Sequence, residues 1–171
     1  MLCSALLSAQ TKWDTVKTAA QNVVTALRID YSGKVLSVHD GDTLRVRDDK
    51  GYTHKIRLAY IDAPELQQAG GFAARDALRG KVQGKRVDVV YFGKDQYQRE
   101  IAKIVLNKED INAWLIENGW AWHYKSIAKR EQNDWDYAVY QRIQTQAQAA
   151  RAGLWQSNQA VPPWQFRHRQ P

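Results

Sequence analysis

The apolar and polar residues of this chain alternate first with a period of two and later with a period of three to four. The two-residue alternation predicts three strands in succession, at residues 34–38, 43–47 and 52–61. The tight turn His39-Asp40-Gly41-Asp42 separates the first two strands, and Asp48-Asp49-Lys50-Gly51 separates the second from the third. This order predicts three consecutive antiparallel strands.

The pattern becomes helical after Pro64. Between residues 72 and 82 the apolar positions share one face of a helix, and Gly84 closes the segment. Residues 86–92 and 101–106 then alternate again and predict two more strands. Five strands with a helix between the third and the fourth is the element order of an OB-fold barrel.

Two further helices are predicted after the last strand. The first begins at Ile111 and ends near Asn118-Gly119, and the second runs from about residue 131 to residue 152, where Gly153 stops it. We therefore expect an α+β protein whose domain, residues 33–156, is a five-stranded OB-fold barrel with three helices. The basic tail at residues 157–171, which contains prolines and aromatic residues, is expected to be loosely ordered and outside the core.

Residues 1–32 form an extension before this domain. The apolar start resembles the remains of a secretory signal, although the basic residues that usually begin one are missing. Residues 11–28 have helical spacing and predict an amphipathic helix. No stretch reaches the roughly 20 apolar residues that a transmembrane helix requires. We expect a secreted or periplasmic protein whose extension is a signal or anchor remnant.

Composition narrows the classes of function. A chain of 171 residues with 44% hydrophobic residues suits one packed domain with some terminal structure. Its net charge of +7 favours a polyanionic partner, because clustered lysine and arginine displace counterions from phosphate backbones. The single Cys3 excludes an internal disulfide framework, and the four histidines lack zinc-ligand spacing. Any bound metal is therefore expected to have oxygen ligands.

The stretch from Lys55 to Glu65 combines a β-favouring run with three charged groups. Arg57 lies within the predicted strand, and Asp62 and Glu65 flank Pro64 at its end. Seen alone, such an ending is more typical of a solvated turn than of a functional site. Strict alternation also places Arg57 and Asp62 on opposite faces, so the strand has to bend or leave the sheet between them for both to reach one ligand.

Asp42 and Asp62 are far apart in sequence but can meet where neighbouring strand ends converge. Two carboxylates are a minimal anchor for a divalent cation, and calcium accepts six to eight oxygen ligands in flexible geometry. A bound dication offsets the negative charge that builds up when water attacks a phosphodiester. The alternative is that both aspartates bond nearby backbone amides in turns.

Four separated motifs give the chain a specific resemblance. They are Asp40-Gly41-Asp42-Thr43, Arg57 to Glu65 as Arg-Leu-x-x-Ile-Asp-x-Pro-Glu, Asp95-x-Tyr97-x-Arg99, and Gly153-Leu154-Trp155. In this order and spacing the chain resembles the staphylococcal nuclease (thermonuclease) family over about residues 33–166. The resemblance implies a five-stranded OB barrel with three helices that cleaves DNA and RNA, usually with calcium, leaving 3′-phosphate ends.

The resemblance also implies roles for individual residues. Glu65 is expected to accept a proton from the attacking water or to orient it, and Arg57 and Arg99 are expected to clamp the scissile phosphate. One calcium ion is expected on Asp42, Asp62 and the backbone carbonyl of Ala63.

Three more residues are expected close to these groups. Asp40 corresponds to an acid near the metal that does not bind it. Tyr97 and Tyr124 correspond to tyrosines that contact the phosphate and base of the nucleotide, and stacking of this kind tolerates any base.

Two other functions stay open at the level of sequence. One is a noncatalytic nucleic-acid-binding OB-fold module, although such modules typically lack the carboxylates and arginines present here. The other is a toxin or plasmid-transfer nuclease that uses residues 1–32 to dock on a partner. We expect a monomer that acts on DNA or RNA and needs no obligatory protein partner.

Overall fold

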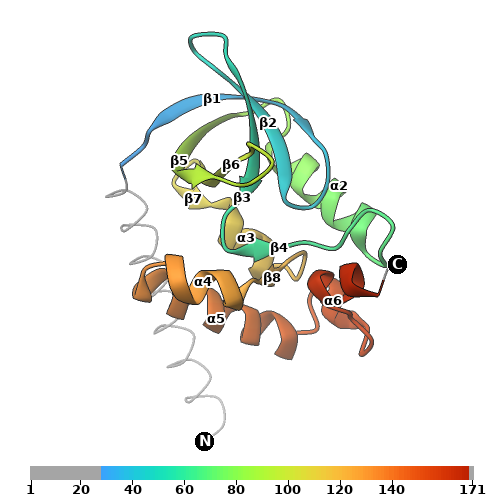
Figure 1. The fold of residues 1–171 in the computed structure, drawn as a ribbon. Coiled ribbons are helices and arrows are strands. Elements are labelled where there is room, and N and C mark those ends of the chain that lie inside the picture. Colours follow the sequence, from blue (N-terminus) through green and yellow to red (C-terminus); the bar gives the residue numbers. More distant parts are fainter. Residues whose placement is uncertain (1–27, 170–171) are drawn as a thin grey trace, which may run out of the picture.

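The computed structural model describes residues 28–169 (Figure 1), so the expected signal remnant and most of the expected helix at 11–28 lie outside the described residues. Secretion, which rests on that extension, stays a prediction. Among residues 28–169, every helix is too short or too polar to span a lipid bilayer.

Five strands form a closed barrel. They are β1 (Tyr31–Val38), β2 (Thr43–Asp48), β3 (Thr53–Leu58), β5 (Arg86–Lys94) and β6 (Glu100–Leu106). Antiparallel pairing runs in the order β3-β2-β1-β5-β6, and parallel pairing of β3 with β6, with Arg57 opposite Ile101, closes the sheet. This confirms the predicted OB-like α+β fold. The first strand begins at Tyr31, two residues before the predicted start of the domain.

The third predicted strand, residues 52–61, is wrong in one respect: it is two strands. β3 ends at Leu58, and the chain then turns through Tyr60, whose φ of 65° is left-handed. β4 (Ile61–Asp62) pairs with β8 (Trp122–His123) instead of with the barrel. The buried Asn112 side chain holds this turn, because its Nδ2 donates to the carbonyl of Ala59 at 3.0 Å. The chain thus leaves the sheet between Arg57 and Asp62, as both side chains need if they are to reach one ligand.

The helices follow the predicted order with two additions. They are α2 (Gly71–Val82), α3 (Ile111–Glu117), α4 (Lys125–Glu131), α5 (Asp134–Ala149) and α6 (Pro163–His168), with a 3-10 turn, η1 (Gly153–Gln156), before α6. In Figure 1, α4 and α5 lie across the lower side of the barrel. A short strand, β7 (Glu109–Asp110), precedes α3.

The additions are α4 and α6. The helix expected from about residue 131 begins at Asp134, because the Asn133 side chain accepts the amide of Asp136 and caps α5 there. The residues before this cap form the separate helix α4. The tail is not the loose segment that its composition predicted: Pro162 and Pro163 start α6, and Pro163 is buried.

A buried ion cluster joins the barrel to the helices. Lys103 of β6 is 1% exposed, and its Nζ lies 2.6 Å from Oδ2 of Asp136 on α5 and 3.3 Å from Oδ2 of Asp110, the cap of α3. The Tyr140 hydroxyl donates to the same Asp110 oxygen at 2.8 Å. Burial alone would lower the pKa of Lys103, but the two carboxylates raise it, so the amine stays charged. The cluster fixes α3 and α5 against the sheet.

Replacement of Lys103 tests this link. We expect Lys103→Met to lower the free energy of unfolding by about 3–5 kcal/mol, because it leaves buried carboxylates without their counter-charge. Urea unfolding followed by circular dichroism measures the change. The double variant Lys103→Met with Asp136→Asn should recover part of the loss.

The matched control is Arg86→Gln. Arg86 forms an ion pair with Asp49 at 2.6 Å, but both side chains are more than half exposed, so its loss should leave stability nearly unchanged. Equal destabilisation by the Lys103 and Arg86 variants would contradict the structural role of the buried cluster.

Candidate active site

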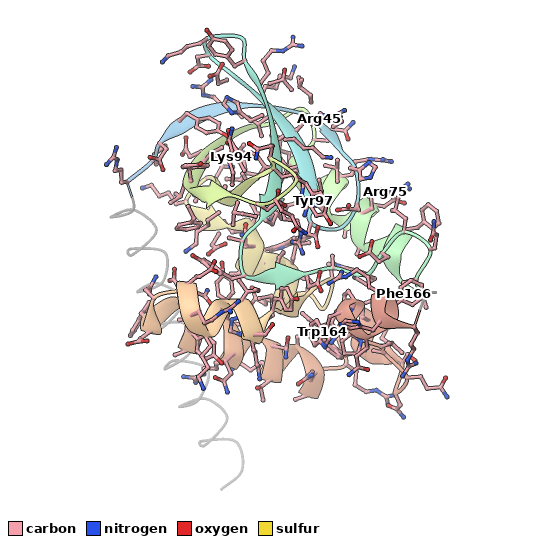
Figure 2. The ribbon with its side chains drawn as sticks, in the orientation of Figure 1. Arg45, Arg75, Lys94, Tyr97, Trp164 and Phe166 are labelled. Carbon is pink, nitrogen blue, oxygen red and sulfur yellow. The ribbon has the colours of Figure 1, made fainter. Side chains whose placement is uncertain are left out.

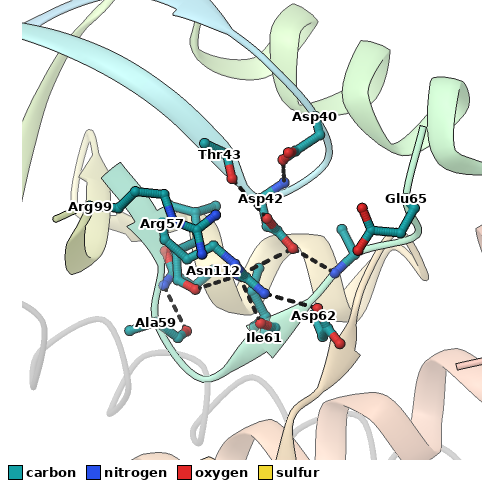
Figure 3. Close-up of polar contacts among 12 residues, drawn as sticks. Asp40, Asp42, Thr43, Arg57, Ala59, Ile61, Asp62, Glu65, Arg99 and Asn112 are labelled. Atoms are coloured by element: carbon teal, nitrogen blue, oxygen red, sulfur yellow. Dashed lines mark hydrogen bonds and ion pairs between the residues drawn. The ribbon is translucent and has the colours of Figure 1, made fainter. Parts of the chain in front are cut away.

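The residues expected at the site converge on one cavity. Its volume is about 740 Å³. The lining includes all nine expected residues: Asp40, Asp42, Arg57, Asp62, Ala63, Glu65, Tyr97, Arg99 and Tyr124. Figure 3 shows the guanidinium groups of Arg57 and Arg99 on one side of the Asp42 carboxylate and Glu65 on the other. The structure therefore brings the residues together, while their roles stay predictions.

The turn between β1 and β2 lies directly against the segment after β4. A Cβ atom on Gly41 would lie 2.6 Å from Cβ of Ala63, so only glycine permits this approach. As a result Oδ2 of Asp42 accepts the backbone amide of Ala63 at 2.8 Å, and the Asp42 carbonyl accepts the amide of Leu58, also at 2.8 Å. The Asp40 side chain holds the turn from the other side by accepting the Asp42 amide at 3.0 Å.

Arg57 fills the bend between β3 and β4. Its Nη1 donates to the carbonyls of Leu58 at 2.9 Å and Ile61 at 3.0 Å, which fixes the chain where it leaves the barrel. The same guanidinium lies 3.1 Å from Oδ2 of Asp42 and donates to Oδ1 of Asp62 at 2.9 Å. The Arg57 side chain thus bonds both to the backbone of the bend and to Asp62 beyond it, and this is how the two residues reach a common site.

The two aspartates are buried. Asp42 is 6% exposed and Asp62 is 1% exposed. The pKa of Asp42 is raised, chiefly by burial; the nearby charges of Asp40 and Asp62 also raise it, whereas Arg57 lowers it. Buried acids that repel one another are stabilised when a cation comes close.

The donor set fits a hard divalent cation. Among residues 28–169, no group of three or more His, Cys, Asp or Glu side chains is arranged to bind a metal, so a cation here would also need backbone and water oxygens. An ion at this site would rest on the Asp42 and Asp62 carboxylates, the Ala63 carbonyl and water. Such mixed oxygen sets are typical of calcium sites and are unsuited to zinc.

Arg99 and Tyr97 are held by Asp95, a residue of the third motif to which sequence reasoning gave no role. Oδ1 of Asp95 accepts the backbone amides of Tyr97 and Arg99, each at 2.9 Å, and its Oδ2 accepts from Nε of Arg99 at 2.7 Å. Burial alone would raise the pKa of Asp95, but the hydrogen bonds from Arg99 and Tyr97 lower it. Arg99 immediately precedes β6, whose parallel pairing with β3 brings it to the cavity that Arg57 also lines.

The C-terminal helix contributes two residues that the sequence did not predict. Arg167 also lines the cavity, with Nη2 lying 2.8 Å from Oδ2 of Asp62 and Nη1 lying 2.7 Å from Oε1 of Glu65. Trp164 stacks on Tyr124, with ring centroids 5.4 Å apart and planes 10° from parallel. Only the local composition of the tail, basic and aromatic, hinted at such contacts.

A comparison with protein-family profiles shows the family to which this chain belongs. A profile described as Staphylococcal nuclease homologue matches residues 55–157, which is more than half of the chain. The chain belongs to the staphylococcal nuclease family. Nucleic acid is the substrate class that this family membership implies, and the matched range contains Arg57, Asp62, Glu65 and Arg99.

Individual relatives within the family agree. An uncharacterized endonuclease of Haemophilus influenzae is 36% identical over 137 residues, covering 80% of this chain and 73% of the relative. An uncharacterized endonuclease of Escherichia coli O157:H7 is 37% identical over 141 residues, covering 82% of this chain and 87% of the relative. A probable staphylococcal-like nuclease, CAN3 of rice (Oryza sativa subsp. japonica), is 33% identical over 143 residues, covering 83% of this chain and 34% of the relative.

The Asp95 turn predicts a graded effect on activity. Asp95→Ala should lower kcat/KM on single-stranded DNA by about 10- to 100-fold, because it releases Arg99 and Tyr97 from their positions. Asp95→Asn should lose less, since an asparagine oxygen can still accept the two backbone amides. Steady-state kinetics of both variants measure the order.

The control for this series is Asp76→Ala. Asp76 forms exposed ion pairs with Arg75 and Arg79 on α2 and does not line the cavity, so activity should stay unchanged. If the alanine and asparagine variants of Asp95 both kept full activity, the turn would have no part in positioning the arginine.

Proposed function

We propose that this protein is a calcium-dependent endonuclease that hydrolyses phosphodiester bonds of DNA or RNA with little sequence specificity and leaves 3′-phosphate ends. The observation that carries the proposal is the common cavity in which the Asp42, Asp62 and Glu65 carboxylates lie with the Arg57 and Arg99 guanidinium groups. A module that only binds nucleic acid has no use for buried acids facing a polyanion.

The residues suit separate parts of the reaction. Asp42, Asp62 and the Ala63 carbonyl would hold the ion, which when bound supplies positive charge to the phosphate oxygens and polarises the P–O bond. Arg57 and Arg99 would bind two phosphate oxygens through paired donors and strengthen that contact as charge accumulates. Arg57 is held at the cavity by two backbone carbonyls, through Nη1.

Glu65 would handle the proton of the attacking water. Its side chain is 41% exposed at the cavity, so it can reach solvent. As the water oxygen bonds to phosphorus, Glu65 takes one water proton, the bond from phosphorus to the 5′-oxygen breaks, and that oxygen takes a proton from solvent. The phosphate stays on the 3′-oxygen.

Stacking would hold the nucleotide beside the phosphate. Tyr97 is 70% exposed at the rim, and the Arg99 guanidinium lies 5.6 Å from its ring centroid. An exposed aromatic ring next to a phosphate-binding arginine accepts any base, which supports low sequence specificity.

Glu65→Gln separates an enzyme from a binding module. The amide keeps the size of the side chain but cannot take a proton, so kcat with calcium should fall by about 10²- to 10⁴-fold while DNA binding persists. Cleavage of labelled single-stranded DNA measures kcat, and fluorescence anisotropy measures binding. In the wild-type protein, a chelator should abolish cleavage and added calcium should restore it.

The matched control is Glu109→Gln. Glu109 has a similar exposure, 39%, and pairs with Lys81 away from the cavity, so this variant should cleave at the wild-type rate. Cleavage by Glu65→Gln at the wild-type rate would remove the proposed role of Glu65. Cleavage that chelation does not affect would remove the metal requirement.

A further inference from the structure

The C-terminal arm, residues 161–169, occupies the acidic half of the site. Arg167 donates to both carboxylate oxygens of Asp62, at 3.2 and 2.8 Å, and to Oε1 of Glu65 at 2.7 Å. Arg57 also donates to Oδ1 of Asp62, at 2.9 Å. Both oxygens of this aspartate are therefore engaged by guanidinium groups, and a cation can reach Oδ2 only if Arg167 leaves.

A second contact of the arm covers the nucleotide half of the site. Trp164 stacks on Tyr124, the residue expected to meet a base. Behind it, the buried Gln68 donates from Nε2 to the carbonyl of Val161 at 2.5 Å, which ties the start of the arm to the segment after β4. Figure 2 shows Trp164 and Phe166 of α6 on the side of the molecule opposite Arg45 of the barrel. The arm thus covers both Asp62, which is expected to bind the metal, and Tyr124, which is expected to stack on a base.

The arm is held weakly enough to be displaced. α6 has six residues, and Pro163 is its only buried residue. The Arg167 side chain is 41% exposed, so solvent screens its ion pairs, whereas Asp62 beneath it is buried. A buried carboxylate is costly unless a positive charge lies next to it. Either an arginine of the arm or a divalent ion can supply that charge.

We propose that the C-terminal arm is an intramolecular inhibitor of this site, in which Arg167 occupies Asp62 and Glu65 until a divalent cation displaces it. The arm lies beyond residue 157, where the match to the family profile ends. The inference rests on the proposed function, because the cation that competes with Arg167 is the one that Asp42 and Asp62 would hold. Calcium binding and arm opening are then linked equilibria.

The experiment compares calcium affinity by isothermal titration calorimetry for the full chain and three variants. Arg167→Gln should bind calcium about tenfold more tightly than wild type, a gain of about 1.4 kcal/mol, because the competitor is gone. Trp164→Ala should also bind more tightly, since it loosens the arm without touching the carboxylates. Arg169→Gln removes the same charge two residues away and should bind like wild type.

Hydrogen exchange gives a readout that does not depend on affinity or activity. In α6 the amides of Gln165 and Phe166 donate to the Pro162 carbonyl, and that of Arg169 donates to the Phe166 carbonyl. Saturating calcium should speed exchange of residues 163–169 in the wild type. In Arg167→Gln, exchange there should already be fast without calcium.

The outcomes separate the two proposals. Equal calcium affinity in wild type and Arg167→Gln, with no change in exchange of α6, would overturn the inhibitory arm and leave the proposed nuclease standing. Unchanged affinity with lost cleavage in Arg167→Gln would make Arg167 a substrate-binding residue and also overturn it. Absence of calcium binding in every protein, with no cleavage, would overturn the proposed function together with the arm.

Discussion

The arrangement of this site depends on one electrostatic constraint: two carboxylates are buried and therefore need positive charge close by. Asp42 precedes β2 of the barrel, Asp62 lies on β4 outside it, and Arg57 forms ion pairs with both. Because an unpaired buried carboxylate is costly, the backbone is shaped to keep a guanidinium in reach of both. The bend after β3, the close approach at Gly41 and the contact with Arg167 all serve this requirement.

The fold supplies rigidity to this charge arrangement. Closing the barrel by parallel pairing of β3 with β6 brings Arg57 of β3 and Arg99, the residue before β6, to the same cavity. The Lys103 cluster ties α3 and α5 to β6, and Asn112 of α3 holds the turn at Ala59, which lines the cavity. The site thus lies where the barrel, the β3 to β4 turn and α3 meet, so its geometry is determined by elements on three sides.

Alternation predicted the strands of the barrel, whereas most residues of the cavity were expected from the resemblance of the charged motifs to the nuclease family. The sequence required a bend between Arg57 and Asp62 but could not place it at Tyr60, since β-favouring residues continue through Ile61 and the turn is held by Asn112 and Arg57. It also missed α4, which a local cap at Asn133 separates from α5.

The contacts of Arg167 with Asp62 and Glu65 join residues about one hundred positions apart, and no periodic pattern encodes them. The same holds for the pairing of Lys103 with Asp136. Long-range ion pairs are selected by tertiary structure, so the part of the site supplied by the tail became visible only in three dimensions.

The most direct measurement is a crystal structure of the protein grown with calcium, with anomalous scattering used to locate the ion. The account predicts one calcium ion bonded to Asp42, Asp62 and the carbonyl oxygen of Ala63, with Arg57 still beside both carboxylates. An ion bound elsewhere, or Asp42 and Asp62 unchanged at a saturating calcium concentration, would contradict it.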